Sequence, residues 1–373
     1  MKIVVIGTRG FPNVQGGVEK HCEELYPKLV NLGVDVTVIT RSSYVKEKIK
    51  SFKGVKFIHL FSIRKKSIET IVHTFFAILK LHKLKPDIVH IHTIGVSLLI
   101  PLVKFQGYKV VMTHHGPDYM RKKWKCPAKF FLKKGEENAT KYSNAIISVS
   151  NWIKEYIENK YGRFSHFIPN GVSAITDFDK NSNFKYNTLE KFKITAKNYI
   201  LTVSRFVPEK GIEDLINAYA LINNPAFKLV IAGGADHETS YSKYIKKLSN
   251  KTEGVILTGT LFKEDLFNLY KNSSLFILAS YYEGFPISLL EALSFGIPFL
   301  ITDIPAHREI KIQGFRYFSP GNVNELSDKI ISCVKQSIDE KEKLYYLNTI
   351  KSNYDWDDIA AKTFNVYKNV LNI

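Results

Sequence analysis

The chain has 373 residues, of which 45% are hydrophobic and 24% charged, and its formal net charge is +18. A chain of this length is too long for a single hydrophobic core and fits two α/β domains. The composition excludes a disordered or fibrous protein. The three cysteines, Cys22, Cys126 and Cys333, are odd in number and widely spaced, which excludes a disulfide framework and a CxxC metal site and suits a reducing cytoplasm.

The first half of the chain alternates short apolar runs with amphipathic segments. The opening KIVVIG is β-branched and ended by a glycine, which is typical of a buried parallel strand. Gly16-Gly17 precedes an amphipathic pattern over 18–32 that stops at Gly33 and predicts a helix. The β-α-β order predicts a doubly wound domain over residues 1–172. Its further strands are expected at 34–40, 55–60, 87–93, 109–115 and 144–150.

A second series of strands and helices follows a polar segment, residues 173–198, that is typical of a linker. The second domain is predicted over 173–353, and a final helix from Tyr354 to the end is expected to pack back on the first domain. Two Rossmann-like domains would face a central cleft, with any ligand at the carboxyl ends of both sheets. The second series of strands is expected at 199–205, 227–234, 254–259, 274–280 and 298–303.

The segment SRFVPEKG, residues 204–211, follows an expected strand directly and opens a helix. Arg205 and Lys210 therefore bring two positive charges to one strand end, beside a helix N-terminus. A bidentate guanidinium, a point-charge ammonium and helix-end N–H groups are what a diphosphate needs. A solvated basic loop is the alternative, but the pair after a strand favours a diphosphate site.

The segment YYEGFPISLLEALSFGIP, residues 281–298, also follows an expected strand. Glu283 precedes a glycine turn, and Glu291 lies about two turns along a helix that begins near Pro286. Its N-terminus can offer N–H groups to phosphate, and carboxylates accept hydrogen bonds from sugar hydroxyls. Glu291 could instead be a surface helix residue, although its neighbours are apolar.

SRFVPEKG followed by the E-x7-E of EGFPISLLE resembles glycosyltransferase family 4, which comprises retaining enzymes of the GT-B fold, and points to its bacterial polysaccharide and rhamnosyltransferase-like branch. The resemblance covers nearly the whole chain, since GTRGFPNVQGGVEKH and WDDIAAKTFNVYKNVL also match the pattern. It implies a hexosyltransferase that uses a nucleotide-sugar donor and a glycan or glycolipid acceptor, with no cofactor.

The resemblance implies that Arg205 and Lys210 bind the donor diphosphate, that Glu283 lies near the transferred sugar, and that Glu291 takes the ribose hydroxyls. The backbone beside the sugar and the start of the diphosphate motif complete this site, through Gly284, Phe285, Pro286 and Ser204.

In the first domain, the resemblance implies that the Gly16-Gly17 loop closes onto the phosphate and the acceptor. Glycines let backbone N–H groups approach an anion closely, which agrees. His115 corresponds to the family's histidine near the donor sugar. His114 is a competing assignment, because the register is ambiguous by one residue, and either could be a core histidine.

Two acidic motifs, DFD at 177–179 and DWD at 355–357, match the metal-binding DxD of the other glycosyltransferase fold. Neither follows a hydrophobic strand, so turn acids and helix-capping acids are the better interpretations. Because Arg205 and Lys210 already neutralise the diphosphate, no metal is expected.

Three other classes of protein are alternatives. A nicotinamide oxidoreductase is disfavoured because the first strand is followed by GTRG rather than GxGxxG, and the second ends at Thr40-Arg41 without a ribose-binding acid. A non-catalytic polyanion-binding protein would rest on the basic half alone, and no nucleic-acid-binding motif supports it. A nucleotide-sugar epimerase or phosphorylase of the same fold stays open.

The positive charge is unevenly placed. Residues 1–190 carry 31 Lys and Arg against 15 Asp and Glu, whereas residues 191–373 carry 22 against 20. A coding bias toward lysine does not easily explain this asymmetry. Arg64–Lys66, residues 67–85 and Arg121–Lys123 suggest docking on an anionic membrane rather than on nucleic acid. We therefore expect a cytoplasmic protein, peripheral on the inner face of the plasma membrane, in capsule or other cell-surface polysaccharide synthesis. The segment 67–85 could equally be a crossover helix packed on its sheet.

Overall fold

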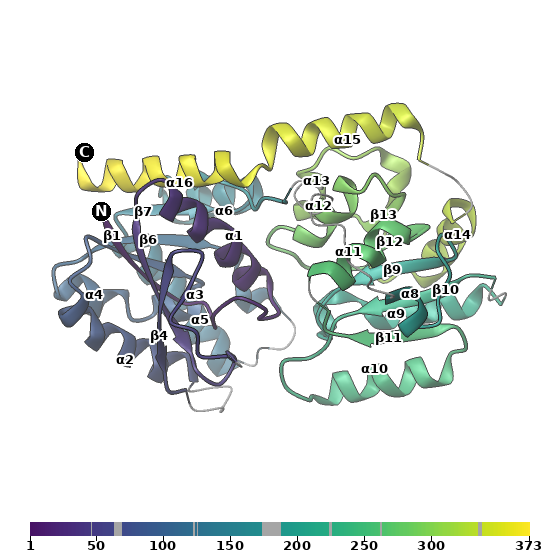
Figure 1. Ribbon diagram of the computed structural model, residues 1–373, viewed down its shortest axis with the longest axis horizontal. Helices are drawn as coiled ribbons and strands as arrows, with labels where there is room; N and C mark the ends of the chain where they lie inside the picture. Colours follow the sequence, from purple (N-terminus) through teal and green to yellow (C-terminus); the bar gives the residue numbers. More distant parts are fainter. Residues whose placement is uncertain are drawn as a thin grey trace. The chain divides into compact units, whose positions relative to one another are not determined.

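The computed structural model describes residues 1–45, 47–62, 69–121, 124, 126–173, 188–223, 226–261, 263–334 and 338–373. The chain divides into two compact units (Figure 1). Unit 1 comprises Met1–Gly171 and Trp356–Ile373, and unit 2 comprises Val172–Asp355. Unit 1 is therefore discontinuous in sequence, because its last helix comes from the end of the chain.

Unit 1 is built on an eight-stranded sheet in the order β3-β4-β2-β1-β5-β6-β7-β8. Its neighbouring strands are parallel except for the antiparallel pair β3–β4. The strands are β1 (Lys2–Ile6), β2 (Asp35–Arg41), β3 (Ser51–Phe52), β4 (Val55–Leu60), β5 (Ile88–His92), β6 (Lys109–His114), β7 (Ala145–Ser148) and β8 (His166–Phe167).

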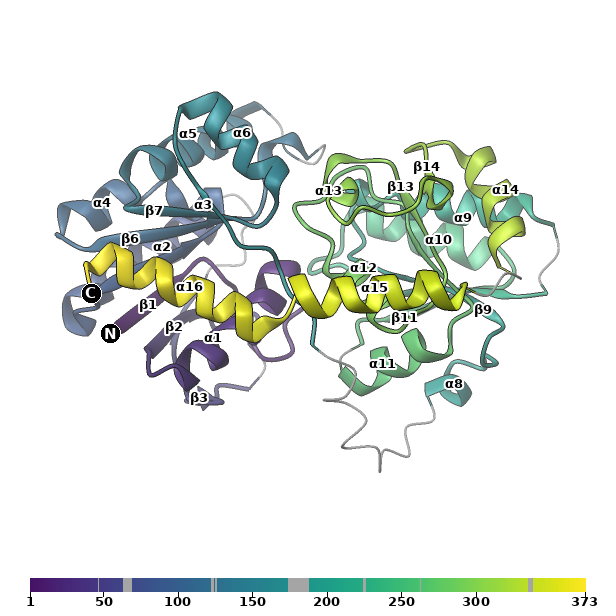
Figure 2. The ribbon, with the colours of Figure 1, turned by 90° about the horizontal axis from the view of Figure 1, so that it is seen from above.

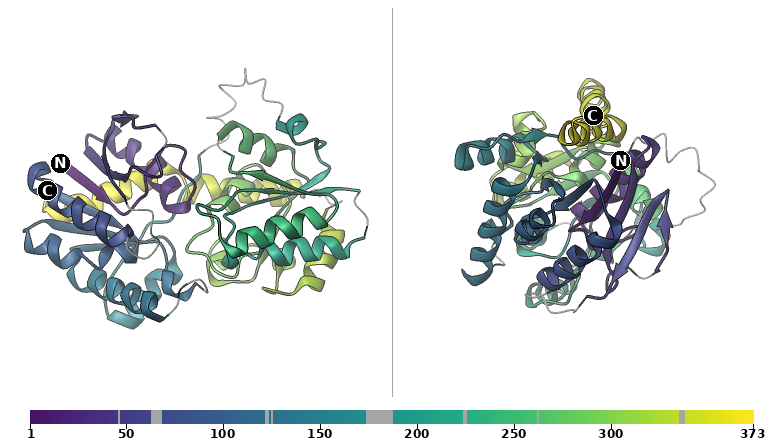
Figure 3. Two further views of the ribbon diagram at one scale, coloured as in Figure 1. Left: turned by 90° about the horizontal axis from the view of Figure 1, so that it is seen from below. Right: turned by 90° about the vertical axis from the view of Figure 1, so that its left-hand side faces the viewer.

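Helices cover both faces of this sheet. The helices are α1 (Gly17–Asn31), α2 (Glu69–Leu84), α3 (Ile94–Ser97), α4 (Ile100–Phe105), η1 (Asp118–Met120), α5 (Cys126–Tyr142), α6 (Asn151–Tyr161) and α16 (Trp356–Leu371). α1 and α16 lie side by side on one face (Figure 2), where Trp356, Ile359 and Tyr367 join the core formed by α1 and the strands. α2, α4 and α5 lie on the other face, which Figure 3 shows from below as the blue helices.

Unit 2 is built on a six-stranded parallel sheet in the order β11-β10-β9-β12-β13-β14. The strands are β9 (Tyr199–Val203), β10 (Lys228–Ala232), β11 (Val255–Gly259), β12 (Leu275–Leu278), β13 (Phe299–Thr302) and β14 (Tyr317–Phe318). The helices are α8 (Thr188–Lys191), η2 (Pro208–Lys210), α9 (Ile212–Leu221), α10 (Ser240–Lys251), α11 (Lys263–Asn272), α12 (Ile287–Ser294), α13 (Pro305–Arg308), η3 (Gly314–Arg316), α14 (Val323–Cys333) and α15 (Glu340–Asn353).

The structure shortens several expected strands and adds elements. β9 ends at Val203 and β6 at His114, so Arg205 and His115 lie in loops rather than in strands. A run of apolar residues indicates that a segment is buried, but it does not indicate where the hydrogen bonds to the neighbouring strand end. The two-residue strands β3, β8 and β14 are too short to give a hydrophobic pattern in the sequence. The sequence also did not predict α15, and α8 lies inside the expected linker. The DFD motif lies outside the described residues.

Each sheet contains one point where the strand order reverses. In unit 1 it lies between β1 and β5, and in unit 2 between β9 and β12. Loops that leave two such neighbouring strands at their carboxyl ends run to opposite sides, and this opens a place for a ligand. Among the described residues, none of the helices is long and apolar enough to cross a membrane.

Candidate functional site

In unit 2 the loop after β9 packs against the end of β12. Gly211 has a φ of +60°, and a Cβ there would lie 2.1 Å from the Ala279 carbonyl oxygen, so only glycine allows this approach. The Tyr281 N–H also donates to the Glu209 carbonyl at 2.9 Å. These contacts bring Lys210 to the turn that carries Glu283.

Lys210 and Glu283 form a buried ion pair at this point. The Lys210 ammonium donates to Glu283 Oε1, and the Ser280 hydroxyl donates to the same oxygen at 2.7 Å. The two side chains are only 16% and 10% exposed. Burial alone would raise the pKa of Glu283, but the Lys210 charge and these hydrogen bonds outweigh it and hold the pKa below its ordinary value. Glu283 is therefore charged at neutral pH.

His307 on α13 also lies near this pair, and sequence reasoning missed it. Its ring is fully buried, and burial lowers its pKa to about 4 although the nearby Glu283 carboxylate opposes the shift. Nδ1 lies 2.7 Å from the Thr302 carbonyl oxygen, so Nδ1 carries the proton. Nε2 has no hydrogen-bond partner within the part of the chain that the structure describes. A lone histidine after a strand left no motif to find it by.

The other predicted donor residues surround this turn. Arg205 points to Asp236, with Nη1 3.5 Å from Oδ2, and in the part of the chain that the structure describes it makes no hydrogen bond to the Lys210–Glu283 pair. Glu291 is half-buried on α12 and accepts a 3.0 Å hydrogen bond from the buried Tyr270, so it is not a solvated surface residue. Ser204 is buried. Gly284 and Phe285 are buried too, and Pro286 precedes the first turn of α12.

In unit 1 the Gly16-Gly17 loop forms the start of α1. Gly16 has a φ of +147°, and a Cβ there would lie 2.1 Å from Glu19 Oε2, whereas a Cβ at Gly17 would meet nothing within 4 Å. Arg9 donates to both Glu19 oxygens, from Nε at 3.1 Å and from Nη2 at 3.0 Å, and to the Gln15 carbonyl. Arg9 thus ties this loop to Glu19 in the first turn of α1, a role that the sequence pattern did not reveal.

The structure gives different positions to His114, the last residue of β6, and His115, which follows it. His114 is fully buried and uses both ring nitrogens: Nε2 lies 3.0 Å from Glu136 Oε1, and the Gly116 N–H donates to Nδ1 at 3.1 Å. His115 is half-buried and lies beyond the strand. The structure therefore gives His114 a hydrogen-bonding role in the core, whereas the role of His115 near the donor sugar stays a prediction.

Glu136 anchors the loop that follows His115. Its carboxylate accepts hydrogen bonds from Tyr119 at 2.8 Å, Tyr161 at 2.6 Å and Lys160 at 3.0 Å. Burial would raise its pKa, but the hydrogen bonds, led by that of His114, lower it to about 2.

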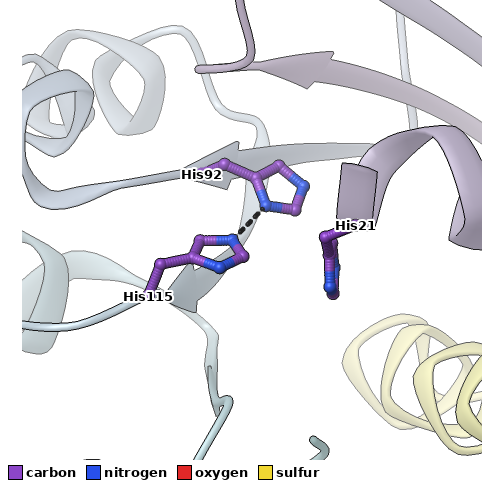
Figure 4. Close-up of side chains that lie close together, drawn as sticks. All are labelled: His21, His92 and His115. Atoms are coloured by element: carbon purple, nitrogen blue, oxygen red, sulfur yellow. Dashed lines mark hydrogen bonds between the residues drawn. The ribbon is translucent and has the colours of Figure 1, made fainter. Parts of the chain in front are cut away.

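His115 belongs to a cluster with His21 and His92 (Figure 4). One ring nitrogen of each lies within 4.8 Å of the others. Burial lowers the pKa of His21 to about 4 and holds those of His92 and His115 well below 6.5, so all three are neutral at pH 7. Neutral imidazoles can hold zinc, but two ligands of one tetrahedral zinc stand roughly 3.3 Å apart. His92 Nδ1 and His115 Nε2 are 2.9 Å apart, which is a hydrogen-bond distance.

Two family models match the chain, one on each side of the unit boundary. Residues 15–174 match "Glycosyltransferase Family 4", and residues 187–350 match "Glycosyl transferases group 1". An uncharacterized glycosyltransferase of Methanocaldococcus jannaschii, MJ1607, is 25% identical, with 99% of this chain and 98% of the relative covered. The O-antigen chain mannosyltransferase RfbU of Salmonella typhimurium is 23% identical over 77% of this chain and 80% of its own length.

A solved structure shares the fold. Alr3699/HepE of Anabaena, in complex with UDP-glucose, superposes with a TM-score of 0.76 at 17% identity, covering 99% of this chain and all of the other. The predicted GT-B fold is thereby confirmed. The chain belongs to glycosyltransferase family 4, and it is a hexosyltransferase.

Proposed function

We propose that this enzyme transfers a hexose with retention of configuration from a nucleotide-sugar, bound by unit 2, to an acceptor hydroxyl, with no metal or other cofactor. The observation that carries the proposal is the meeting of Lys210 and Glu283 where the strand order of unit 2 reverses. The Lys210 ammonium, positioned by its carboxylate partner, can bind a diphosphate, and α12 starts four residues beyond Glu283.

The charges of unit 2 suit a dissociative transfer. As the bond between the anomeric carbon and the phosphate oxygen breaks, negative charge grows on the diphosphate, where Lys210 and Arg205 stabilise it. The acceptor oxygen bonds to the anomeric carbon on the same face, and its proton passes to the leaving phosphate oxygen. Glu283 and Glu291 then serve as hydrogen-bond acceptors for sugar and ribose hydroxyls rather than as nucleophiles.

Nucleotide binding tests this proposal directly. One of UDP, GDP, dTDP and ADP should raise the melting temperature by several degrees, because a ligand at about 100 times its Kd adds ~2.7 kcal/mol of stability. Lys210→Ala should abolish the rise. Lys243→Ala, which removes an exposed lysine of α10, should leave it intact. If none of the nucleotides stabilised the wild type, the donor site would be misassigned.

Product analysis separates transfer from the epimerase and phosphorylase alternatives. A transferase consumes the nucleotide-sugar only when an acceptor is present and yields a glycosylated acceptor. An epimer formed without acceptor, or phosphate-dependent formation of a sugar phosphate, would replace the proposal.

We also propose that unit 1 docks on an anionic membrane, as a cytoplasmic enzyme acting on a lipid-linked glycan of the cell surface. The name of the Salmonella relative supports this acceptor class. The supporting surface is the outer face of α2 and α5, the docking face. On α2, His73, Ala77 and Ile78 are buried as a crossover helix requires, while Phe75 and Phe76 are exposed beside Lys80 and Lys83.

α5 repeats this arrangement on the same side of the sheet. Phe130 and Phe131 are exposed, and Lys133 and Lys134 follow them. Aromatic side chains enter the interface of a bilayer, and each nearby lysine adds about 1 kcal/mol on anionic lipid. Of the expected basic segments, Arg64–Lys66 and two residues of Arg121–Lys123, Lys122 and Lys123, lie outside the described residues.

Vesicle sedimentation tests the docking face. Binding to phosphatidylcholine vesicles that contain phosphatidylglycerol should exceed binding to phosphatidylcholine alone. Replacing Lys80 and Lys83 by glutamine should weaken it by ~2 kcal/mol. The matched pair Lys243→Gln and Lys247→Gln, on α10 of unit 2, should have no effect. Equal binding to both vesicles would exclude the electrostatic account.

A further inference from the structure

A chain of buried hydrogen bonds ends on His115. The Tyr26 hydroxyl lies 2.5 Å from His92 Nε2, and His92 Nδ1 lies 2.9 Å from His115 Nε2. Tyr26 and His92 are fully buried, so neither can exchange these partners for water. The ring of His115 is thereby held through Nε2, and Nδ1 is the nitrogen left for another group.

The hydrogen bonds at the other end of this network determine which atoms donate a proton and which accept one. His90 stacks on His92 with ring centroids 4.5 Å apart, and its Nδ1 lies 2.5 Å from the Tyr367 hydroxyl and 3.0 Å from that of Tyr26. His90 Nε2 lies 2.8 Å from Thr113 Oγ1.

A phenol is a better donor than a neutral imidazole N–H, and an imidazole nitrogen is a better acceptor than a phenol oxygen. Each hydroxyl therefore donates to its nearest imidazole: Tyr367 to His90 Nδ1, and Tyr26 to His92 Nε2. His92 must then carry its proton on Nδ1 and donate it to His115 Nε2. It follows that neutral His115 carries its proton on Nδ1.

We infer that Tyr26 and His92 are positioning residues that fix His115 as the Nδ1–H tautomer, so that it presents a hydrogen-bond donor to a hydroxyl of the bound sugar. Nδ1 of His115 makes no hydrogen bond with any described residue, and the ring is only half-buried. The part of this inference that concerns the sugar rests on the proposed transferase function, whereas the tautomer does not.

The tautomer can be read without any substrate. Long-range ¹H–¹⁵N correlation spectra of the full-length protein, labelled with ¹⁵N-histidine, should show His92 and His115 protonated on Nδ1 and His90 on Nε2. In Tyr26→Phe the ring stays but the donor is lost, so His115 should shift toward the Nε2–H form. Tyr199→Phe is the matched control, since Tyr199 is also buried but donates to the Leu269 carbonyl in unit 2.

Kinetics then connect the tautomer with transfer. Tyr26→Phe and His92→Leu should lower kcat/KM by roughly 3- to 10-fold, the worth of one hydrogen bond. His92→Asn, whose amide N–H can replace Nδ1–H, should restore activity to about wild type, and Tyr199→Phe should not change it. A wild-type His115 protonated on Nε2, or a tautomer and kcat/KM unchanged in Tyr26→Phe, would overturn the inference. If the protein showed the expected tautomer but no transferase activity, the hydrogen-bond network would be supported and the proposed function refuted.

Discussion

The polar groups around His115 in unit 1 differ from those around Glu283 in unit 2. Unit 1 buries neutral rings: His21, His90 and His92 are held by amide, hydroxyl and imidazole partners at the end of its sheet. Unit 2 buries a charge pair, Lys210 with Glu283, at the corresponding strand ends. A neutral network costs little to bury and can orient an uncharged hydroxyl, whereas a charge pair keeps a cation ready for an anion. This difference is consistent with the proposal that unit 2 binds the donor diphosphate.

The units also differ in how the chain builds them. Unit 2 is continuous, but the histidine network of unit 1 depends on α16, because Tyr367 bonds His90 and the Trp356 ring lies 5.6 Å from that of His21. The last helix is therefore part of the core of unit 1. All three tryptophans belong to unit 1, so tryptophan fluorescence reports on that unit.

The largest expected effect is the loss of the anchor that α16 gives to unit 1. Trp356→Ala should destabilise unit 1 by about 3–5 kcal/mol, because a fully buried indole is removed. Urea unfolding followed by fluorescence of the remaining tryptophans would measure it. Trp152→Ala, at a half-buried position of α6, should cost less. An equal loss in both variants would mean that α16 is not special.

The charge side of the comparison is tested at Arg205. Arg205→Ala should remove about 2–4 kcal/mol of transition-state stabilisation, the usual contribution of one electrostatic contact to a developing charge. The loss would be measured as a fall in kcat/KM. The exposed Lys243→Ala serves as the control. A change within a few fold would refute the diphosphate role of Arg205.

The buried neutral histidines of unit 1 are tested by measuring stability at lower pH. The folded-state pKa values of His21 and His90 are lowered by burial to about 4 and about 3, against 6.5 for the free group. Their contribution to stability is present above pH 6.5 and is lost as the pH falls, by about 2 kcal/mol for each histidine at pH 5. Urea unfolding by tryptophan fluorescence at pH 7 and pH 5 should show this loss, and His21→Gln should reduce it. The exposed His82→Gln should not. Stability independent of pH would contradict the buried neutral network.

The smallest expected effect concerns Glu291. Glu291→Gln should raise the KM for the donor about tenfold, near 1.4 kcal/mol, because an amide accepts ribose hydroxyls less well than a carboxylate. Tyr270→Phe, which removes its hydrogen-bond donor, should have a weaker effect in the same direction. An unchanged donor KM in Glu291→Gln would remove the ribose role.

The sequence by itself determined the two-sheet architecture, the family and the enzyme class. Short apolar runs with glycine ends encode buried parallel strands, and SRFVPEKG with the E-x7-E motif encodes local loop geometry. These patterns can be recognised in the sequence because they depend only on residues that are neighbours along the chain. The sequence did not predict the strand ends, and with them the loop positions of Arg205 and His115, because apolar runs continue past the last hydrogen bond between strands.

Only the tertiary structure decided which side chains meet. It paired Lys210 with Glu283, directed Arg205 to Asp236, tied the Gly16 loop to Arg9 and placed His307 near the donor pair. It also joined Tyr26, His92 and Tyr367 into one network that ends on His115. These partners come from different strands, loops and helices, up to 277 positions apart for His90 and Tyr367. No local pattern encodes such contacts, because they form only when the sheets assemble and α16 returns to the first unit.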